Sequence, residues 1–172
     1  MENKSQKLLN SLRVYYGNRN RFSMIESIIN ANPDSNKVSL RLVDWLITNY
    51  SKSRNIVYYV KNIPFNIHQS YKNMLKAYSK RLFDPFRRHG RVVLEFDGRT
   101  LETTVAQLSF FKWAIDNDVL KYAIDHKSDI KDDMDTHTRH RHDKTIVEKR
   151  KELSKCTKGA NMYSVNICVS FT

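Results

Sequence analysis

Clustered lysines and arginines are the side chains of this sequence with the clearest chemical use, and that use is the binding of phosphate. Between residues 72 and 91 the chain carries a basic run in which Asp84 is the only acidic residue. Clustered cations neutralise phosphates and release the counterions that a nucleic acid holds. A solvated helix face is the alternative interpretation, because runs of charge often have no other role. We predict phosphate contacts from Lys72, Lys76, Lys80, Arg81, Arg87, Arg88 and Arg91.

A second group worth testing lies where histidines alternate with arginines. His137, His140 and His142 form the most metal-like cluster of the sequence, and zinc accepts imidazole ligands. Their spacing fits no standard zinc finger, however, and the interleaved Arg139 and Arg141 would disfavour a nearby cation. We therefore predict that these two arginines contact phosphate from a solvated loop, with zinc as a weak alternative and no cofactor.

Motifs that carry catalysis are absent from the sequence. It contains no G-x-S-x-G nucleophile elbow, no Walker loop, no G-x-G-x-x-G and no H-E-x-x-H. The aspartates between residues 129 and 135 lack the spacing and the glycine of a calcium-binding EF-hand loop. We predict that the protein is not an enzyme.

The charge of the whole chain agrees with a polyanionic partner. Thirty Lys and Arg against 18 Asp and Glu give a net charge of +12, and a field of that size attracts polyanions. Nucleic acid, with DNA favoured, or an acidic protein surface would suit it. Two cysteines, Cys156 and Cys168, are too few for a disulfide framework. With no signal segment at the start and no apolar run of 18 residues, an intracellular protein without membrane contact is expected.

The elements that would position the basic segment follow from hydrophobic spacing. Apolar residues recur at steps of three and four between residues 67 and 82, which predicts an amphipathic helix. Lys72, Lys76 and Lys80 stand four apart on another face of that helix, so that like charges line up. The helix is expected to close at residues 84–85, because a residue that precedes proline avoids helical geometry.

A hairpin is expected directly after the basic segment. Residues 91–96 and 99–104 have the composition of strands, and the Asp97–Gly98 pair between them is typical of a two-residue type I′ turn. Thr104 and Gln107 then form a capping box that opens a further helix. That helix would expose only one basic side chain, Lys112, so residues 67–82 are the better candidate for contact with DNA.

Helices and strands are interspersed along the rest of the chain. Ser39 is the expected N-cap of a helix, residues 56–60 form a β-branched and aromatic strand, and strict alternation over residues 163–171 predicts a C-terminal strand. We predict an α+β fold, in which several helices pack on a small, largely antiparallel sheet that includes the hairpin and the C-terminal strand.

The domain organisation is expected to be simple. Residues 1–35 are predicted to form an N-terminal helical extension, and residues 36–172 a single α+β domain. Residues 126–143 are almost devoid of apolar side chains, which predicts a long, charged, His-rich loop on the surface.

Four segments resemble small basic proteins of large nucleocytoplasmic DNA viruses, some of which are described as late transcription factors. These segments are SLRLVDWLITNY (39–50), NIHQSYKNMLKAYSKRLFDPFRR (66–88), TTVAQLSFFKWAIDNDVLKY (103–122) and VNICVSF (165–171). The family supplies no catalytic residues to carry over. The resemblance implies a viral DNA-associated factor that acts in the cytoplasm or nucleus of the infected cell or is packaged in the virion.

Charge and resemblance together predict a nucleic-acid-binding protein that contacts phosphates through a basic helix and the connector after it. A virion structural or polymerase-associated component, whose basic surface meets an acidic protein surface, is the alternative. Components of the transcription machinery or a second copy of the chain are the further partners expected.

Overall fold

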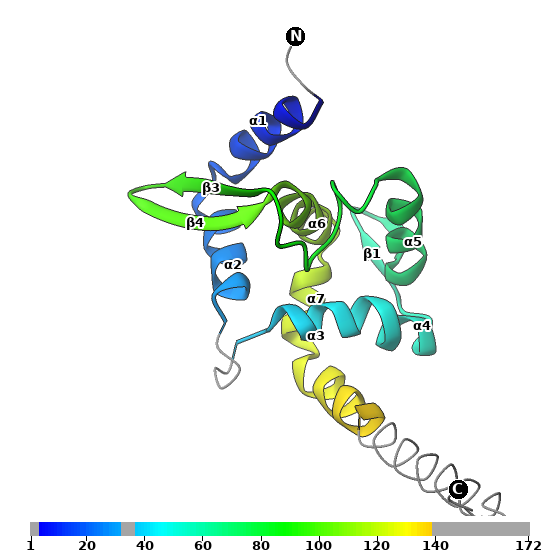
Figure 1. Cartoon of the computed structure of the whole chain (residues 1–172). Coiled ribbons are helices and arrows are strands. Elements are labelled where there is room, and N and C mark those ends of the chain that lie inside the picture. Colours follow the sequence, from blue (N-terminus) through cyan, green and yellow to red (C-terminus); the bar gives the residue numbers. More distant parts are fainter. Residues whose placement is uncertain (1–3, 32–36, 139–172) are drawn as a thin grey trace, which may run out of the picture. The chain divides into compact units, whose positions relative to one another are not determined.

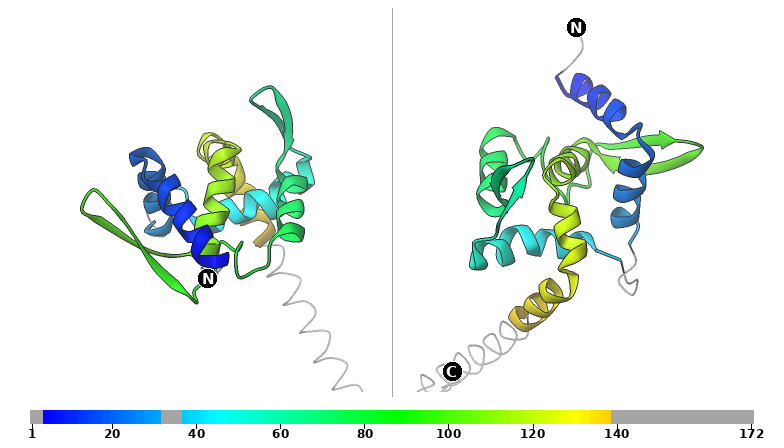
Figure 2. Two further views of the ribbon diagram at one scale, coloured as in Figure 1. Left: turned by 90° about the horizontal axis from the view of Figure 1, so that it is seen from above. Right: turned by 180° about the vertical axis from the view of Figure 1, so that it is seen from behind.

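The computed structural model of the protein describes residues 4–31 and 37–138. The chain divides into two compact units, Met1–Met134 and Asp135–Thr172, and the fold below is that of the first unit (Figures 1 and 2). Its labelled helices are α1 (Lys4–Tyr16), α2 (Arg19–Ile29), α3 (Leu40–Trp45), α4 (Ser51–Arg54), α5 (Ile67–Ala77), α6 (Val105–Asp116) and α7 (Val119–Asp125), with a π-helical turn, η1 (Leu46–Tyr50), between α3 and α4. Its strands are β1 (Val57–Val60), β2 (Ile63–Asn66), β3 (Arg91–Phe96) and β4 (Arg99–Thr104).

The core is organised around α6, which is apolar on almost every side. Figures 1 and 2 show α6 in the middle of the unit, with α1 on one side and α5 on the other. The Tyr16 hydroxyl of α1 donates a 2.8 Å hydrogen bond to the Leu108 carbonyl. From the α5 side, Ser70 Oγ accepts a 3.1 Å hydrogen bond from Trp113 Nε1. A helix enclosed in this way has to be hydrophobic all round.

The two N-terminal helices contribute to this same core. Leu12 of α1 and Phe22 and Ile25 of α2 are buried, and they belong to one hydrophobic cluster with Phe110 of α6. The sequence suggests an extension at residues 1–35. The structure instead places α1 and α2 in the compact unit with the helices that follow, because their apolar stripes find partners there.

The predicted hairpin forms and packs against α2. β3 and β4 pair antiparallel, and the turn residues Asp97 and Gly98 both have positive φ, 51° and 73°, as a type I′ turn requires. The hairpin is fastened to α2 by the ion pair of Arg99 with Glu26, at 2.7 Å. The Asp-Gly signal therefore predicted the turn correctly.

A second hairpin follows the predicted strand at residues 56–60. The chain reverses at Lys61 and Asn62, both with positive φ, and returns as β2. Pro64 is tolerated in β2 because this strand has an open edge, where a missing N–H costs nothing. The two hairpins are separate two-stranded sheets, so the single small sheet predicted from the sequence is not what the described residues form. The α+β class is confirmed.

The helix predicted at residues 67–82 is shorter than expected. α5 ends at Ala77, and Tyr78 has an extended backbone with φ −121° and ψ 141°. The Ser79 carbonyl then accepts a 3.1 Å hydrogen bond from the Phe83 amide, in a new turn that buries the Phe83 ring. Burial of this ring ends the helix, and the expected end at residues 84–85 was wrong.

The predicted loop at residues 126–143 was wrong for its first part. Residues 127–138 are helical. Ile130 is buried, and the Asp133 carboxylate accepts a 2.9 Å hydrogen bond from Trp45 Nε1 of α3. The burial of Ile130 and the contacts of Asp133 with distant helices help to order a segment whose own composition predicts a loop.

Two other predictions concern the C-terminal strand and the absence of membrane contact. The predicted C-terminal strand at residues 163–171 lies outside the described residues. Within the described ranges, no helix combines the length and the apolar character that crossing a bilayer would require.

Candidate nucleic-acid interface

The basic segment becomes a connector, residues 78–90, that runs from the end of α5 to the start of β3. Its middle is anchored in the core. Phe83 is fully buried and lies 5.7 Å from Phe110 and 6.0 Å from Trp113, between ring centroids. Pro85 is buried as well. These anchors hold the connector against α6, so its charged side chains are left at the surface.

Hydrogen bonds fix the second half of the connector on the N-terminus of α6. Gln107 Nε2 donates to the Pro85 carbonyl at 2.9 Å, and Thr104 Oγ1 donates to the Arg87 carbonyl at 3.5 Å. Both contacts come from the first turn of α6 and its N-cap. The position of Arg87 is therefore set by the helix that it faces.

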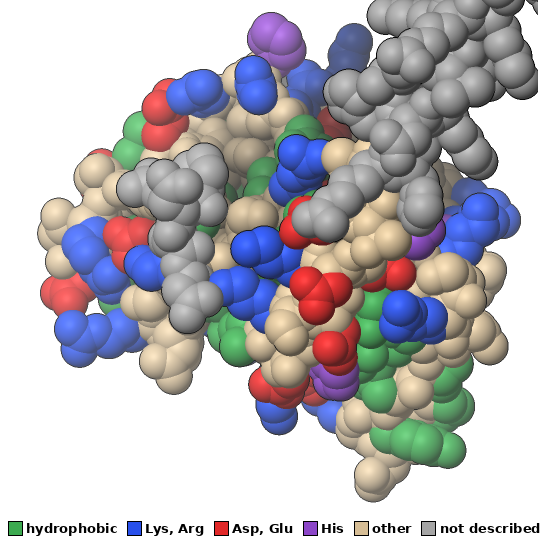
Figure 3. Space-filling view, turned by 90° about the horizontal axis from the view of Figure 1, so that it is seen from below, with side chains coloured by type: hydrophobic (Ala, Val, Ile, Leu, Met, Phe, Trp, Pro, Cys, Tyr) green, Lys and Arg blue, Asp and Glu red, His purple; other side chains and the backbone are tan. Residues whose placement is uncertain are grey.

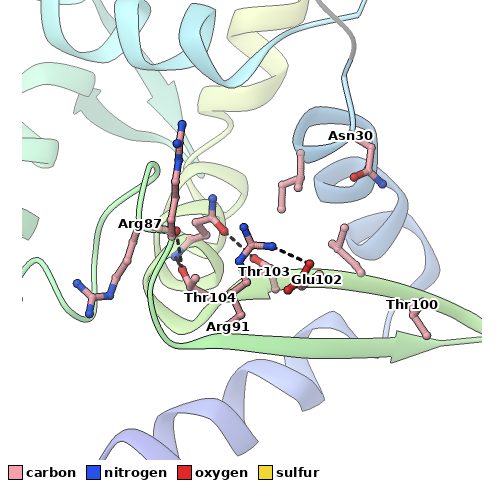
Figure 4. A pocket seen from close by; sticks show the side chains of 11 residues that line it. Asn30, Arg87, Arg91, Thr100, Glu102, Thr103 and Thr104 are labelled. Atoms are coloured by element: carbon pink, nitrogen blue, oxygen red, sulfur yellow. Dashed lines mark hydrogen bonds and ion pairs between the residues drawn. The ribbon is translucent and has the colours of Figure 1, made fainter.

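A pocket of about 360 Å³ opens beside these contacts (Figure 4). Three of the predicted phosphate-binding arginines line it, on the connector and on β3, and hydroxyl and amide side chains complete the wall. The lining residues are Ile29, Asn30, Arg87, Arg88, Arg91, Thr100, Leu101, Glu102, Thr103, Thr104 and Gln107. We call this the arginine pocket.

The first turn of α6 strengthens the positive character of the arginine pocket. Thr104 is the N-cap, and its hydroxyl accepts a hydrogen bond from the Gln107 amide at 3.2 Å. Helix N-termini present backbone N–H groups and the positive end of the helix dipole, which favours anions. Three arginines and the first turn of a helix thus line the same pocket, an arrangement that favours an anion.

The three arginines are not equivalent. Arg91 Nη1 lies 2.7 Å from Glu102 Oε2 on the neighbouring strand (Figure 4), so a carboxylate offsets its charge. Among the residues that the structure describes, neither Arg87 nor Arg88 has an acidic partner within ion-pair distance. Arg88 is exposed and Arg87 is partly buried. These two are therefore the better candidates for contact with an anion.

The predicted ladder of lysines is broken in the structure. Lys72 and Lys76 are exposed on α5, and Lys76 lies in the last turn, where a cation also stabilises the helix dipole. Lys80 and Arg81 follow the end of the helix and are exposed on the connector. The basic residues therefore continue from α5 along the connector instead of sharing one helix face.

Asp84 is the one acidic residue of the connector, and its Oδ1 accepts a 2.9 Å hydrogen bond from the Phe86 amide. Burial raises the pKa of the Asp44 carboxyl on α3, and the charge of Asp84 raises it further. The pKa of Tyr71 is raised to about 12, by burial and then by the charges of Asp44 and Asp84. The charge of Asp84 therefore acts on partly buried groups of α3 and α5.

Two groups of predicted residues are only partly covered by the structure. Arg139 and Arg141 lie outside the described residues. Of the three histidines, His137 is exposed on the helical segment 127–138, whereas His140 and His142 lie outside the described ranges. Within those ranges, no three His, Cys, Asp or Glu side chains are grouped as metal ligands would be.

Net charge does not by itself locate an interface on this surface. The face in Figure 3 carries Lys and Arg side chains intermixed with Asp and Glu. Several arginines elsewhere are paired, among them Arg19 with Asp97 and Arg54 with Asp133. What distinguishes the arginine pocket is that three arginines line one hollow.

Several residues of the arginine pocket were not expected from the sequence. Thr100 and Thr103 belong to β4, and Asn30 follows α2. The capping box at residues 104–107 was a usable signal, because it located a helix N-terminus. That the connector returns to this terminus depends on contacts in the core, which spacing along the chain does not reveal.

Comparison with known sequences places the protein among viral ones. A family described as "Family of unknown function (DUF7197)" matches residues 1–171. The chain belongs to this family. The protein called "Uncharacterized protein L507" of Acanthamoeba polyphaga mimivirus is 35% identical over 137 residues, which cover 74% of this chain and 52% of the mimivirus protein. The chain thus spans about half the length of that relative. No solved structure matches.

The similarity to a giant-virus protein confirms the predicted resemblance to proteins of large DNA viruses. The description of the DUF7197 family names no function, and neither does that of the mimivirus relative. Association with DNA and a part in transcription therefore stay predictions, which have to be argued from the site.

Proposed function

We propose that this member of the DUF7197 family is a nucleic-acid-binding protein that holds backbone phosphates in the arginine pocket and along the connector. The observation that carries the proposal is that Arg87, Arg88 and Arg91 line one pocket beside the N-terminus of α6. Arginine suits this purpose because its planar guanidinium forms bidentate hydrogen bonds with phosphate oxygens.

The remaining basic side chains extend the same interface. Lys80 and Arg81 are exposed on the connector, and Lys72 and Lys76 on the helix before it. Contacts of this kind position a nucleic acid without reading its sequence. In a protein related to a giant-virus protein, DNA is the favoured ligand, and the role we propose is that of a viral DNA-associated or transcription factor.

The test is a salt titration of DNA binding. Binding of a labelled duplex is measured by fluorescence anisotropy between low and physiological salt, for the wild type and for the double variant Arg87→Ala/Arg88→Ala. Loss of two phosphate contacts should reduce the slope of log K against log salt by about 2. The control is Arg13→Ala/Lys121→Ala, which removes two exposed charges from α1 and α7.

Two outcomes would overturn the proposal. One is the absence of nucleic-acid binding by the wild type even at low salt, for duplex and single strands alike. The other is an equal change of slope in the pocket variant and the control variant, which would mean that net charge alone is responsible.

A virion structural or polymerase-associated component is the second candidate. The β1–β2 hairpin favours a protein partner, since Tyr59 is 75% exposed and Ile63 is 67% exposed. Competition distinguishes the two candidates. If polyglutamate displaces DNA at equal charge concentration, the basic surface accepts any polyanion, and an acidic protein becomes the better ligand. If it does not, phosphate is recognised.

A further inference from the structure

A second pocket, of about 240 Å³, lies at the other end of the connector. It opens where α5 ends, beside α1 and α6, and aromatic and apolar side chains supply much of its wall: Met74, Tyr78, Phe83 and Trp113. Ser109, Lys112 and Asp116 of α6 line it as well, and Lys112 forms an ion pair with Asp116. We call this the aromatic pocket. The connector thus contributes to both pockets, at its start and at its end.

Tyr78 is the exposed member of a stack of rings. It is 41% exposed, and it stacks on Phe83 with 6.2 Å between centroids and 30° between planes. Phe83 in turn makes an edge contact with Trp113 at 6.0 Å. The inner rings hold Tyr78 in place, so an aromatic face is available at the surface without the cost of ordering a free side chain.

Exposed cations lie close to Tyr78 along the chain. Lys76 precedes Tyr78 by two residues, and Lys80 and Arg81 follow it within three; all are exposed. In the described part of the chain, none of them has an acidic partner within ion-pair distance. An aromatic face between basic side chains suits a ligand in which flat rings alternate with phosphates.

The two pockets together favour a single strand over a duplex. From Tyr78 to Arg87 the chain reaches at most about 30 Å even when fully extended, so one short oligonucleotide could contact both ends of the connector. A base within a duplex is stacked on its neighbours and does not present its face to a protein side chain. An unpaired base does, and stacking on aromatic side chains tolerates any sequence.

We propose that Tyr78 and the aromatic pocket hold an unpaired base, so that the connector binds single-stranded nucleic acid in preference to duplex. This inference rests on the proposed function, because the arginine pocket would hold a phosphate of the same strand. It adds the class of nucleic acid and a binding site that the phosphate contacts do not explain.

The experiment compares a single strand of about ten nucleotides with the duplex of the same sequence, at one salt concentration. The variants are Tyr78→Ala, Tyr78→Leu, which keeps apolar bulk without an aromatic face, and Tyr78→Phe, which keeps the ring. We expect Tyr78→Ala and Tyr78→Leu to bind the single strand about 5- to 150-fold more weakly, Tyr78→Phe to match the wild type, and duplex binding to change little.

Trp113 provides a second readout, because it lines the aromatic pocket and is almost fully buried. A Trp45→Phe background leaves Trp113 as the single tryptophan of the chain. Addition of the single strand should quench its fluorescence, and the duplex should not. Circular dichroism of each variant separates loss of binding from loss of fold.

The outcomes distinguish this inference from the proposed function. If the wild type binds neither the single strand nor the duplex, the proposed function and this inference are both overturned. If it binds both forms equally, or if Tyr78→Ala leaves the ratio of single-strand to duplex affinity unchanged, this inference alone is overturned. If an apolar peptide quenches Trp113 and the single strand does not, the aromatic pocket docks a protein segment, and this inference is likewise overturned.

Discussion

Arg91 Nη1 and Glu102 Oε2 lie 2.7 Å apart at the edge of the arginine pocket. Each side chain is more than half exposed, so the pair contributes little to stability. Its larger effect is electrostatic, since the carboxylate offsets the charge of one of the three arginines that line the pocket. Glu102 therefore limits the attraction of the arginine pocket for anions.

Substitution Glu102→Gln should strengthen the binding of nucleic acid. It frees Arg91 for a phosphate, and the slope of log K against log salt should steepen by about 0.9. The measurement is the anisotropy titration of the wild type and the variant over the same salt range. Glu95→Gln is the matched control, because it removes the same charge from an exposed site of the same hairpin. Equal effects of the two substitutions would contradict a local role for Glu102.

The β3–β4 turn should depend on the glycine at its second position. Gly98 has φ of 73°, and a Cβ built on it would meet no atom within 4 Å, so the cost of a side chain there is conformational. Gly98→Ala should lower the free energy of unfolding by about 1–2 kcal/mol, as measured by urea denaturation. Gly98→Asn should lower the free energy of unfolding by less, because asparagine adopts a positive φ more readily than alanine. An unchanged stability of Gly98→Ala would mean that the hairpin tolerates another turn.

The hydrogen bond from Tyr16 to the Leu108 carbonyl should contribute measurably to stability. The tyrosine is almost fully buried, and burial is the main cause that raises the pKa of its hydroxyl. Tyr16→Phe should lower the free energy of unfolding by about 1 kcal/mol. The control is Tyr59→Phe, which removes a hydroxyl from a side chain that is 75% exposed and should change nothing. Equal stabilities of the two variants would contradict the joint core of α1 and α6.

Local signals in the sequence predicted local structure well. Ser39 and Thr104 are the N-caps that the sequence indicates, and Asp97 with Gly98 forms the predicted turn. Caps and turns are decided by residues within four positions of one another, so spacing along the chain is sufficient to find them. The hairpin and the start of α6, which shape half of the arginine pocket, were therefore predictable.

The rest depends on contacts between distant residues. The apolar stripe predicts a helix that continues to residue 82, yet the ring of Phe83, just beyond it, joins Phe110 and Trp113 in the core. That packing ends α5 and turns the connector toward α6. Likewise, the residues near Asp133 in the sequence do not predict its contact with Trp45. Tertiary packing overrode the local pattern at both places.

The acidic residue beneath the connector should make stability depend on pH. Burial, and then the charge of Asp84, raises the pKa of Asp44 in the folded protein above its ordinary value, which is about 3.9. Between those two values the folded state binds more protons than the unfolded state. The contribution of Asp44 to stability therefore falls as pH rises through this window and stays unfavourable above it.

Substitution Asp44→Asn removes this penalty while it keeps the shape of the side chain. The variant should be more stable than the wild type at pH 7, and its stability should vary less with pH above about 4. Urea denaturation of both proteins across pH 4–8 measures the difference. Asp84→Asn should give part of the same gain, because it removes the second cause of the raised pKa and leaves an oxygen for the Phe86 amide that now donates to Asp84 Oδ1. A variant Asp44→Asn that is less stable by a constant amount at every pH would contradict this, because it would mean that the Asp44 side chain makes a favourable contact that does not depend on its charge.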